Sequence, residues 1–258
     1  MNRKIPKEVF VGMYLPGRKL FEFSVKLKNE PKSLEKVCSL LETLDVKLLN
    51  GFFTTRPDGI TFAFTSDLTD LELKAGELAK KLKSLGSVLE VRFKGSKPKG
   101  FLADELHFPL LALGDRSILL RADTMREMFK RLYEVFGEGA STIIYYMGME
   151  AGQRKVAKIM KLGLGGKELV ELILKERVAK GWCIPKLLEF DESAHKARVR
   201  AYQLFECMPK RKGGIGSRFF MGYLSGLFRS IFGDVEVEEV KCISKGDRYC
   251  EFVVRPKG

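Results

Sequence analysis

The sequence predicts an α+β protein that consists of two domains. Its 258 residues exceed the length of one average domain. Strand-like alternation and helix-like periodicity of apolar residues both occur in each half of the chain. A polar and basic segment rich in Gly and Pro, residues 94–100, separates the two halves. We therefore expect an N-terminal arm over residues 1–17, a first domain over 18–94, a linker over 95–104 and a second domain over 105–258.

The composition excludes several classes of protein. Apolar residues make up 45% of the chain and charged residues 31%, which excludes a disordered, collagen-like or membrane-embedded chain. No apolar run reaches the roughly 18–20 residues that a membrane-spanning helix needs. The first eight residues lack the apolar core of a signal peptide, so we expect a cytoplasmic location. Two histidines disfavour chemistry that needs several imidazoles.

The chain is basic, with 46 Lys and Arg against 33 Asp and Glu and a formal net charge of +13. The excess divides almost evenly between residues 1–100 and 101–258, whereas nucleic-acid binding needs a concentrated basic surface. The densest cluster, Lys210-Arg211-Lys212, is short and is interpreted as a solvated loop. We therefore expect no direct nucleic-acid partner. Abundant Lys and Glu with few Asn and Gln are typical of proteins adapted to high temperature.

The first domain alternates strands and amphipathic helices. A helix is expected to begin near Pro31 with Asn29 as its cap, and a second helix covers residues 71–85. The expected strands are Leu20–Lys26, Val46–Thr54, Ile60–Thr65 and Val88–Phe93. The resulting order, strand–helix–strand–strand–helix–strand, is the split pattern of ferredoxin-like βαββαβ folds.

The junction between the first strand and helix reads Asn29-Glu30-Pro31-Lys32-Ser33-Leu34. With this motif, the run from Leu20 to Phe93 resembles an ACT domain, a regulatory module that binds small effectors, often amino acids, at dimer interfaces. The Pro and Leu match the pattern of the family, but Lys32 stands where the family has Gly. Because a long side chain obstructs close approach of a ligand to the backbone, an architectural or dimerising role is an alternative to an effector site.

The second domain is expected to contain four helices and three strand pairs. Gly148 and Gly152 lie four residues apart in one helix, a spacing that permits close helix packing or shapes a pocket wall. The helix at 217–232 is apolar nearly all round, which is typical of a buried helix or of one that lines a cavity. The expected elements are a strand pair at 106–112 and 116–121, helices beginning near Asp123 and spanning 140–160, 167–180 and 217–232, and hairpins at 182–190 with 196–207 and 235–244 with 248–255.

The last hairpin carries the most specific spacing, Glu239-x2-Cys242-x7-Cys250. A three-residue loop would place Cys242 opposite Cys250 with Cβ atoms roughly 4.5–5.5 Å apart. The apolar alternation changes phase at Glu238-Glu239, which predicts a bulge there. Facing thiols allow a zinc site, a disulfide or two inert cysteines. Cys207 is a candidate fourth ligand beside Glu239, whereas Cys38 and Cys183 are interpreted as core residues.

Residues from about Phe108 to Val254 resemble the 4-vinyl reductase domain family. The motifs that carry this resemblance are Gly148 with Gly152, Phe205-Glu206-Cys207, Gly222-Tyr223-x2-Gly226, and Glu239-x2-Cys242-x3-Gly246-Asp247-x2-Cys250-x-Phe252. Relatives in that family include phenol- and toluene-sensing domains of bacterial activators and a protein linked to bacteriochlorophyll synthesis. The fold is shared with TRAPP subunits, which form dimers and hold an acyl chain.

The resemblance implies a zinc ion held by Glu239, Cys242 and Cys250. The third Cys of the aromatic sensors lies just before the glycine-rich helix, where this chain has Gly216-Ser217. Cys207 is therefore a substitute ligand only if the fold brings it near.

The function expected from these features is that of a non-enzymatic sensor, because the sequence offers no dinucleotide turn, phosphate loop or His–carboxylate pattern. An apolar pocket in the second domain would bind a small aromatic or acyl molecule, and a homodimer would signal through a protein partner. The alternatives are a dimerisation scaffold without ligand and an enzyme acting on a tetrapyrrole or aromatic ring. The candidate lining residues are Phe129, Tyr145, Gly148, Trp182, Phe219 and Tyr223.

Overall fold

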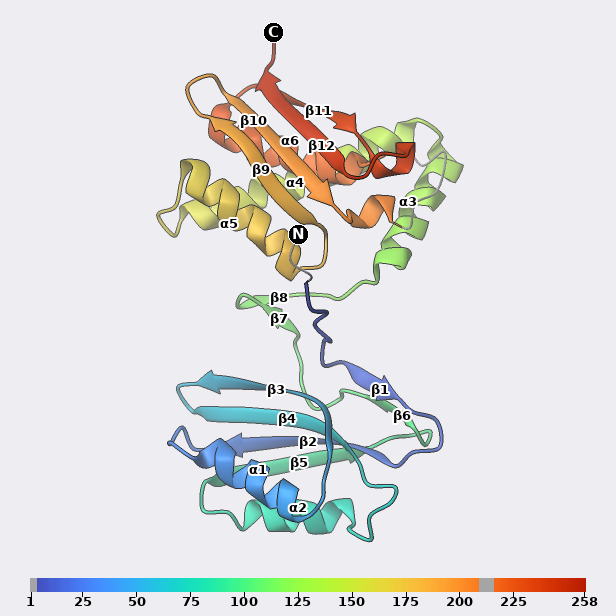
Figure 1. The fold of residues 1–258 in the computed structure, drawn as a ribbon, viewed down its shortest axis with the longest axis vertical. Coiled ribbons are helices and arrows are strands. Elements are labelled where there is room, and N and C mark those ends of the chain that lie inside the picture. The colour runs from blue at the N-terminus through green and yellow to red at the C-terminus, as the bar shows by residue number, and fades with distance from the viewer. Residues whose placement is uncertain (1–3, 209–215) are drawn as a thin grey trace. The chain divides into compact units, whose positions relative to one another are not determined.

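The computed structural model describes residues 4–208 and 216–258, which form two compact units of mixed α and β structure (Figure 1). The first unit ends at Ile118 and the second spans Leu119–Gly258. The basic cluster Lys210-Arg211-Lys212 lies outside the described residues. Within the described part of the chain, no helix combines the length and apolar character needed to cross a membrane.

The first unit is built on a four-stranded antiparallel sheet with strand order β3-β4-β2-β5 and two helices. Phe23 and Val25 of β2 lie on the face that packs against Val37 of α1 and Leu78 of α2, and all four side chains are buried. The period-2 alternation of β2 therefore forms one side of this core. The elements of the sheet and its helices are β2 (Leu20–Leu27), α1 (Ser33–Thr43), β3 (Leu48–Arg56), β4 (Gly59–Asp67), α2 (Ala75–Lys83) and β5 (Val88–Gly95).

Further segments of the first unit pack near the residues of β2 that do not face the helices. β1 (Gly12–Tyr14) pairs antiparallel with β6 (Phe101–Ala103), so the segment expected as a linker over 95–104 contains a strand. His107, four residues beyond β6, lies with its Nε2 2.9 Å from Ser24 Oγ of β2. The segment after β5 thus belongs to the first compact unit, which continues to Ile118.

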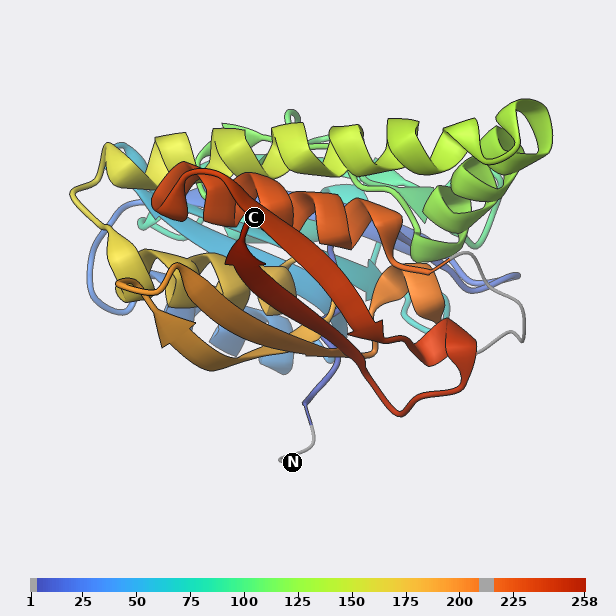
Figure 2. The same ribbon diagram turned by 90° about the horizontal axis from the view of Figure 1, so that it is seen from above.

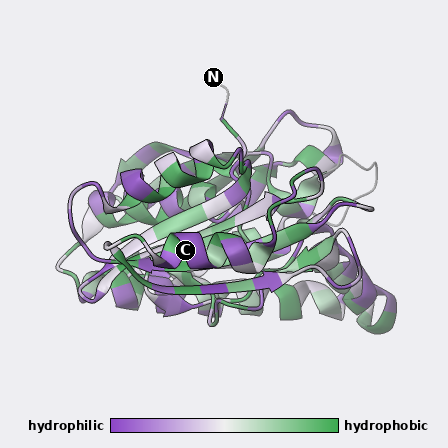
Figure 3. Ribbon diagram, turned by 90° about the horizontal axis from the view of Figure 1, so that it is seen from below, coloured by the Kyte–Doolittle hydropathy of each residue, from purple (hydrophilic) through white to green (hydrophobic). Residues whose placement is uncertain are grey.

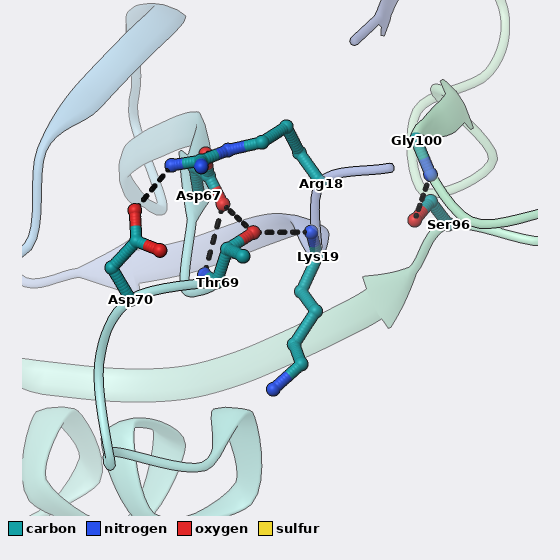
Figure 4. A network of polar contacts seen from close by, with 7 residues as sticks. All are labelled: Arg18, Lys19, Asp67, Thr69, Asp70, Ser96 and Gly100. Carbon is teal, nitrogen blue, oxygen red and sulfur yellow. Dashed lines mark hydrogen bonds and ion pairs between the residues drawn. The ribbon is translucent and has the colours of Figure 1, made fainter. Parts of the chain in front are cut away.

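A polar network fastens the start of β2 to the end of β4 (Figure 4). The carboxylate of Asp67 accepts hydrogen bonds from the Arg18 guanidinium, from Thr69 N at 2.9 Å and from Thr69 Oγ1. Thr69 Oγ1 in turn accepts a bond from Lys19 N at 2.6 Å. Arg18 also binds the Asp70 carboxylate at 2.6 Å. The chain entering β2 is therefore held through side chains as well as through the ladder.

The strand pair expected at 106–112 and 116–121 is wrong in extent. The ladder is limited to β7 (Leu111–Ala112) and β8 (Asp115–Arg116), with the turn at Leu113-Gly114. The backbone amides of Leu106 and His107 donate instead to Asp104 Oδ1, at 3.1 and 3.0 Å. A side-chain acceptor thus replaces the strand ladder over the first part of this segment.

The second unit packs helices against a four-stranded antiparallel sheet with strand order β11-β12-β10-β9. Residues of α6 contact β11 and β12, residues of α5 contact β9, and α4 lies against α6 (Figure 2). Hydrophobic and hydrophilic residues form separate bands on the helices (Figure 3), as expected for helices with a buried side. The elements are α3 (Ala122–Phe136), α4 (Gly139–Met160), α5 (Gly166–Ala179), β9 (Ile184–Asp191), β10 (Lys196–Tyr202), the 3-10 turn η1 (Phe205–Cys207), α6 (Arg218–Phe232), β11 (Val235–Lys241), the 3-10 turn η2 (Ile243–Lys245) and β12 (Cys250–Pro256).

Helices α4 and α6 approach each other through glycines on both helices. A Cβ added at Gly148 would lie 2.0 Å from the Phe219 carbonyl oxygen, and one at Gly152 would lie 2.2 Å from that of Tyr223. Gly222 and Gly226 of α6 meet the backbone of α4 equally closely. Only residues without a Cβ permit this separation, so these glycines set the position of α6.

Two of the expected helix caps are wrong. Helix α1 begins at Ser33 with Lys32 as its N-cap, so Asn29 lies outside the cap position. Helix α3 begins at Ala122 with Arg121 as its N-cap, so Asp123 lies within the first turn. Its carboxylate accepts a bond from Thr124 N at 2.8 Å and pairs with Arg121. An acidic side chain in the first turn still complements the positive end of the helix dipole.

Candidate metal centre and aromatic cluster

Three cysteine sulfurs meet in the second unit. Cys207 ends the turn η1, Cys242 follows β11, and Cys250 begins β12. The Sγ atoms of Cys207 and Cys242 lie 3.7 Å apart, those of Cys207 and Cys250 3.8 Å, and those of Cys242 and Cys250 4.0 Å. All three residues are buried, with at most 3% of their surface exposed. The fold thus brings Cys207 to the two hairpin thiols across more than thirty residues of sequence.

The hairpin places both thiols on one side, as expected, but through a different connection. The three-residue loop is wrong: Cys242 is followed by the turn η2, and its carbonyl oxygen accepts bonds from Lys245 N and Asp247 N. Asp247 Oδ2 accepts the Cys242 amide at 2.8 Å. The register shifts between Glu239 and Lys241, so the bulge lies one residue beyond the predicted position. The turn closes by hydrogen bonds to Cys242 rather than by strand pairing.

Glu239 is joined to the sulfur triangle through Ser217. Ser217 Oγ donates a hydrogen bond of 2.6 Å to Glu239 Oε1. The same oxygen lies 3.2 Å from Cys207 Sγ, 3.5 Å from Cys250 Sγ and 3.9 Å from Cys242 Sγ. Ser217 therefore lies against all three sulfurs and separates them from the carboxylate.

The electrostatics of this group favour a bound cation. Hydrogen bonds from Cys207 and Cys250 lower the pKa of Cys242, and the same contacts raise the pKa of Cys250. The pKa of Cys207 rises to about 12 through its contact with Cys242, and burial raises the pKa of Glu239 to about 7. Without a cation, one negative charge is therefore shared among the sulfurs, because several buried anions repel each other. A cation would permit all of them to ionise.

The donor set fits zinc. Tetrahedral zinc with Zn–S bonds of about 2.3 Å requires sulfurs about 3.8 Å apart. The observed separations of 3.7–4.0 Å match this edge and exceed the roughly 2.0 Å of a disulfide. Glu239 supplies a carboxylate for the fourth position if its bond to Ser217 breaks. Cys183 is buried as expected, whereas the prediction of a core position for Cys38 is wrong, because Cys38 is exposed on α1.

Glu206 is a functional candidate that sequence reasoning missed. Its carboxylate accepts the Phe219 amide at 2.9 Å and the Phe220 amide at 2.7 Å, so it caps the start of α6 from another segment. Burial raises the pKa of Glu206 to about 8. Its position directly before Cys207 was the available signal. This carboxylate fixes the beginning of α6 beside the sulfur triangle.

Four of the predicted ligand residues form one aromatic cluster. The ring centroids of Phe129 and Phe219 lie 5.8 Å apart, those of Trp182 and Phe219 5.5 Å, and those of Trp182 and Tyr223 5.2 Å. Phe205, which the sequence did not single out as a ligand residue, contacts Phe129, Trp182 and Phe219. These five residues are called the aromatic cluster below.

Two further predicted ligand residues have other contacts. The ring of Tyr145 contacts the ring of Tyr146, and its backbone carbonyl meets Gly222 of α6. Gly148 packs against the backbone of Phe219, so it sets the separation of α4 and α6. Both residues thus flank the aromatic cluster through the helix pair.

A buried guanidinium borders the aromatic cluster. Arg177 is 2% exposed, and its guanidinium lies 4.4 Å from the Trp182 ring centroid and 4.8 Å from that of Tyr223. Glu176 accepts one of its N–H groups at 3.2 Å. Within the described residues, Arg177 Nε and the Tyr223 hydroxyl are buried without a hydrogen-bond partner. Two polar groups beside an aromatic surface are thus available to a ligand.

The structure also shows a cavity of about 730 Å³ in the first unit, beside β2 and β5. None of the residues predicted to bind ligand or metal lines this cavity. Its lining residues are Lys19, Leu20, Phe21, Phe93, Lys94, Gly95, Ser96, Lys97, Lys99 and Glu105.

Comparison with known proteins places one family model on the chain. The 4-vinyl reductase domain matches residues 218–256, the segment that contains α6 and the hairpin with Glu239, Cys242 and Cys250. No curated protein sequence matches the chain.

Several solved structures are similar to about half of the chain. The phenol-responsive sensory domain of the transcription activator PoxR with phenol is 19% identical, with a TM-score of 0.47 over 55% of this chain and 77% of that one. A vinyl-4-reductase family protein from Methanocaldococcus jannaschii is 20% identical, with a TM-score of 0.39 over 55% and 85%. A trafficking protein particle complex subunit 3 from Naegleria fowleri, bound covalently to palmitic acid, is 16% identical, with a TM-score of 0.41 over 53% and 95%.

The match and the geometry coincide at the end of the chain. The family model covers α6, β11 and β12, and the same segment supplies two of the three sulfurs, Ser217's helix and two rings of the aromatic cluster. The chain therefore carries a 4-vinyl reductase domain match over its last helix and hairpin, where the candidate metal centre lies.

Proposed function

We propose that this chain is a non-enzymatic regulatory protein whose second unit binds a small hydrophobic molecule beside a zinc site. One observation carries the proposal: the start of α6 belongs to both groups of residues. Ser217 lies against the three sulfurs, and Phe219, two residues later, lies in the aromatic cluster. A ligand that moves Phe219 therefore acts on the helix start that contacts the metal centre.

The ligand is an aromatic or acyl molecule with one polar end. The aromatic cluster supplies the apolar surface, and Tyr145 and Gly148 flank it from α4. Arg177 Nε and the Tyr223 hydroxyl supply a donor for a ligand hydroxyl or carboxylate. Because the rings contact each other, the ligand enters by displacing Phe219 or Trp182.

Zinc is held by Cys207, Cys242, Cys250 and Glu239 in this proposal. The match between the sulfur separations and a tetrahedral edge supports this ligand set. When bound, the metal provides a structural cross-link between η1, the hairpin and the start of α6. The residues of the chain do the rest: Glu206 holds the first amides of α6, and Ser217 orients the Glu239 carboxylate.

The first unit is proposed to be an ACT-like regulatory module. Its strand order β3-β4-β2-β5, with a helix after β2 and another after β4, supports this relation. Lys32 adopts φ 67°, the left-handed conformation that glycine favours, at the position where the ACT pattern has Gly. Its side chain there supports a dimerising rather than an effector-binding role. The proposed assembly is a cytoplasmic homodimer that passes its signal to a protein partner.

Fluorescence of the single tryptophan tests ligand binding, because Trp182 lies in the aromatic cluster and no other tryptophan contributes. Titration with phenol and with palmitate is expected to give a saturable change for at least one probe. Phe129→Ala is expected to weaken this binding about tenfold or more, through loss of one ring contact and its buried area.

The matched control is Phe53→Ala, since Phe53 lies in the first unit and is 65% exposed. It is expected to leave the titration unchanged. The absence of a saturable response to either probe, together with the absence of any co-purifying hydrophobic compound, would contradict the sensor proposal. A stable dimer without ligand response would favour the scaffold instead.

A further inference from the structure

A second cluster of metal-binding side chains lies in the first unit, away from the cysteines. Glu22 and Ser24 lie two positions apart in β2, so both project from the same face of the sheet. Asp104 and His107 follow β6 and are three residues apart. Sequence separations of more than eighty residues therefore converge at one point on β2.

The distances in this cluster centre on one nitrogen. His107 Nδ1 lies 3.1 Å from Glu22 Oε1 and 3.0 Å from Asp104 Oδ1. The other ring nitrogen, Nε2, lies 2.9 Å from Ser24 Oγ. When Nε2–H donates to that hydroxyl, the neutral ring directs the lone pair of Nδ1 toward two carboxylate oxygens. Such an arrangement requires a positive charge between the three atoms, because lone pairs at this separation repel each other.

Burial makes the charge balance decisive. Glu22 is 1% exposed, and the side chains of Asp104 and His107 are 12% and 21% exposed. Two carboxylates with a protonated imidazole leave one net negative charge in this space. Two carboxylates with a neutral imidazole and a divalent cation leave none. Because an uncompensated buried charge is costly, the divalent cation is the better-balanced occupant.

One oxygen of the cluster is without an assigned donor. Glu22 Oε1 is buried, is aimed at His107 Nδ1 and has no hydrogen-bond partner among the described residues. Glu22 Oε2, by contrast, accepts the Glu105 amide at 3.4 Å. The orphan oxygen is therefore the one that faces the imidazole and Asp104.

The separations fit octahedral coordination. Two ligand atoms bound at about 2.1 Å and at right angles lie about 3.0 Å apart. The Nδ1–Oε1 and Nδ1–Oδ1 distances of 3.1 and 3.0 Å match this edge. From this geometry we infer that Glu22, Asp104 and His107 form one face of a binding site for a divalent cation that accepts nitrogen and oxygen ligands, such as Mn²⁺. The cation ties the segment after β6 to β2.

Proton NMR of the wild-type chain tests the inference without any substitution, because the chain has only two histidines. His107 lies in this cluster, and His195 stacks on Phe232 in the second unit. Substoichiometric Mn²⁺ is expected to broaden the ring resonances of His107 and to leave those of His195 sharp. Broadening of neither histidine, or of both equally, would overturn the inference.

The number of sites is measured by the electron paramagnetic resonance of free Mn²⁺. Wild-type chain is expected to bind one Mn²⁺, and His107→Ala and Glu22→Gln to weaken that binding about tenfold or more. His195→Ala and Glu105→Gln are the matched controls, since Glu105 pairs with Lys94 outside the three ligand atoms. Unchanged binding in His107→Ala would contradict the site. Mn²⁺ prefers oxygen and nitrogen over thiolate ligands, so the result is independent of the zinc proposal.

Discussion

The hydroxyl of Ser217 donates a 2.6 Å hydrogen bond to the carboxylate of Glu239. This bond joins the residue that precedes α6 to the bulged strand β11. Because Ser217 also lies within 3.9 Å of all three sulfurs, it occupies a position close to the fourth vertex of the sulfur triangle. The start of α6, the hairpin and η1 therefore meet at one side chain.

Substitution of Ser217 tests that position. Ser217→Ala removes the bond that orients Glu239 and is expected to weaken zinc binding about tenfold, as for other groups that orient a metal ligand. Ser217→Cys places a fourth thiolate near the triangle and is expected to tighten binding. Competition with a chromogenic chelator measures both changes. Weaker binding in Ser217→Cys than in Ser217→Ala would contradict the assigned vertex.

The contact between α4 and α6 predicts a sharp difference between two glycines of the same helix. Gly152→Ala places a methyl group 2.2 Å from the Tyr223 carbonyl oxygen and is expected to lower the free energy of unfolding by about 1–3 kcal/mol. Gly139→Ala has no neighbour within 4 Å and is expected to be neutral or to stabilise by up to about 1 kcal/mol. Denaturant unfolding measures both values. Equal effects of the two substitutions would contradict the close approach.

The network around Asp67 predicts a pH dependence of stability (Figure 4). Burial acts to raise the pKa of Asp67, but hydrogen bonds from Thr69 and Arg18 outweigh it, so the pKa falls below its ordinary 3.8. A lowered folded-state pKa contributes stability that is fully present above the ordinary value and is lost as pH falls through the folded one. Asp67→Asn is therefore expected to be less stable than wild type at pH 7, with the difference closing below about pH 4. Thermal melts between pH 2 and 7 measure it, and a pH-independent difference would contradict the network.

Local patterns predicted the secondary structure well but not the spatial clusters. Alternation in Leu20–Leu27 and helical spacing in Gly139–Met160 depend on neighbours in sequence, so the elements lie close to their expected bounds. The proximity of Cys242 and Cys250 followed from counting along one hairpin. The length of the turn was wrong because Asp247 and the carbonyl of Cys242 close it.

The missed residues act over long distances in sequence. Glu206 caps a helix that begins after a different segment, and Arg177 stacks on rings from other elements. His107 reaches Glu22 across the sheet, so a search for a local His–carboxylate pattern did not identify the pair. The three-residue spacing of Asp104 and His107 was the one local signal. Positions of this kind require the fold itself.

Metal analysis combined with thiol counting tests the central claim most directly. Protein purified without added metal is expected to contain about one zinc per chain, and Cys183→Ser is expected to retain it because Cys183 lies outside the triangle. Cys250→Ser is expected to lose it, and denatured wild type is expected to show five free thiols. A metal-free wild type, a disulfide among Cys207, Cys242 and Cys250, or zinc retained in Cys250→Ser would contradict the account.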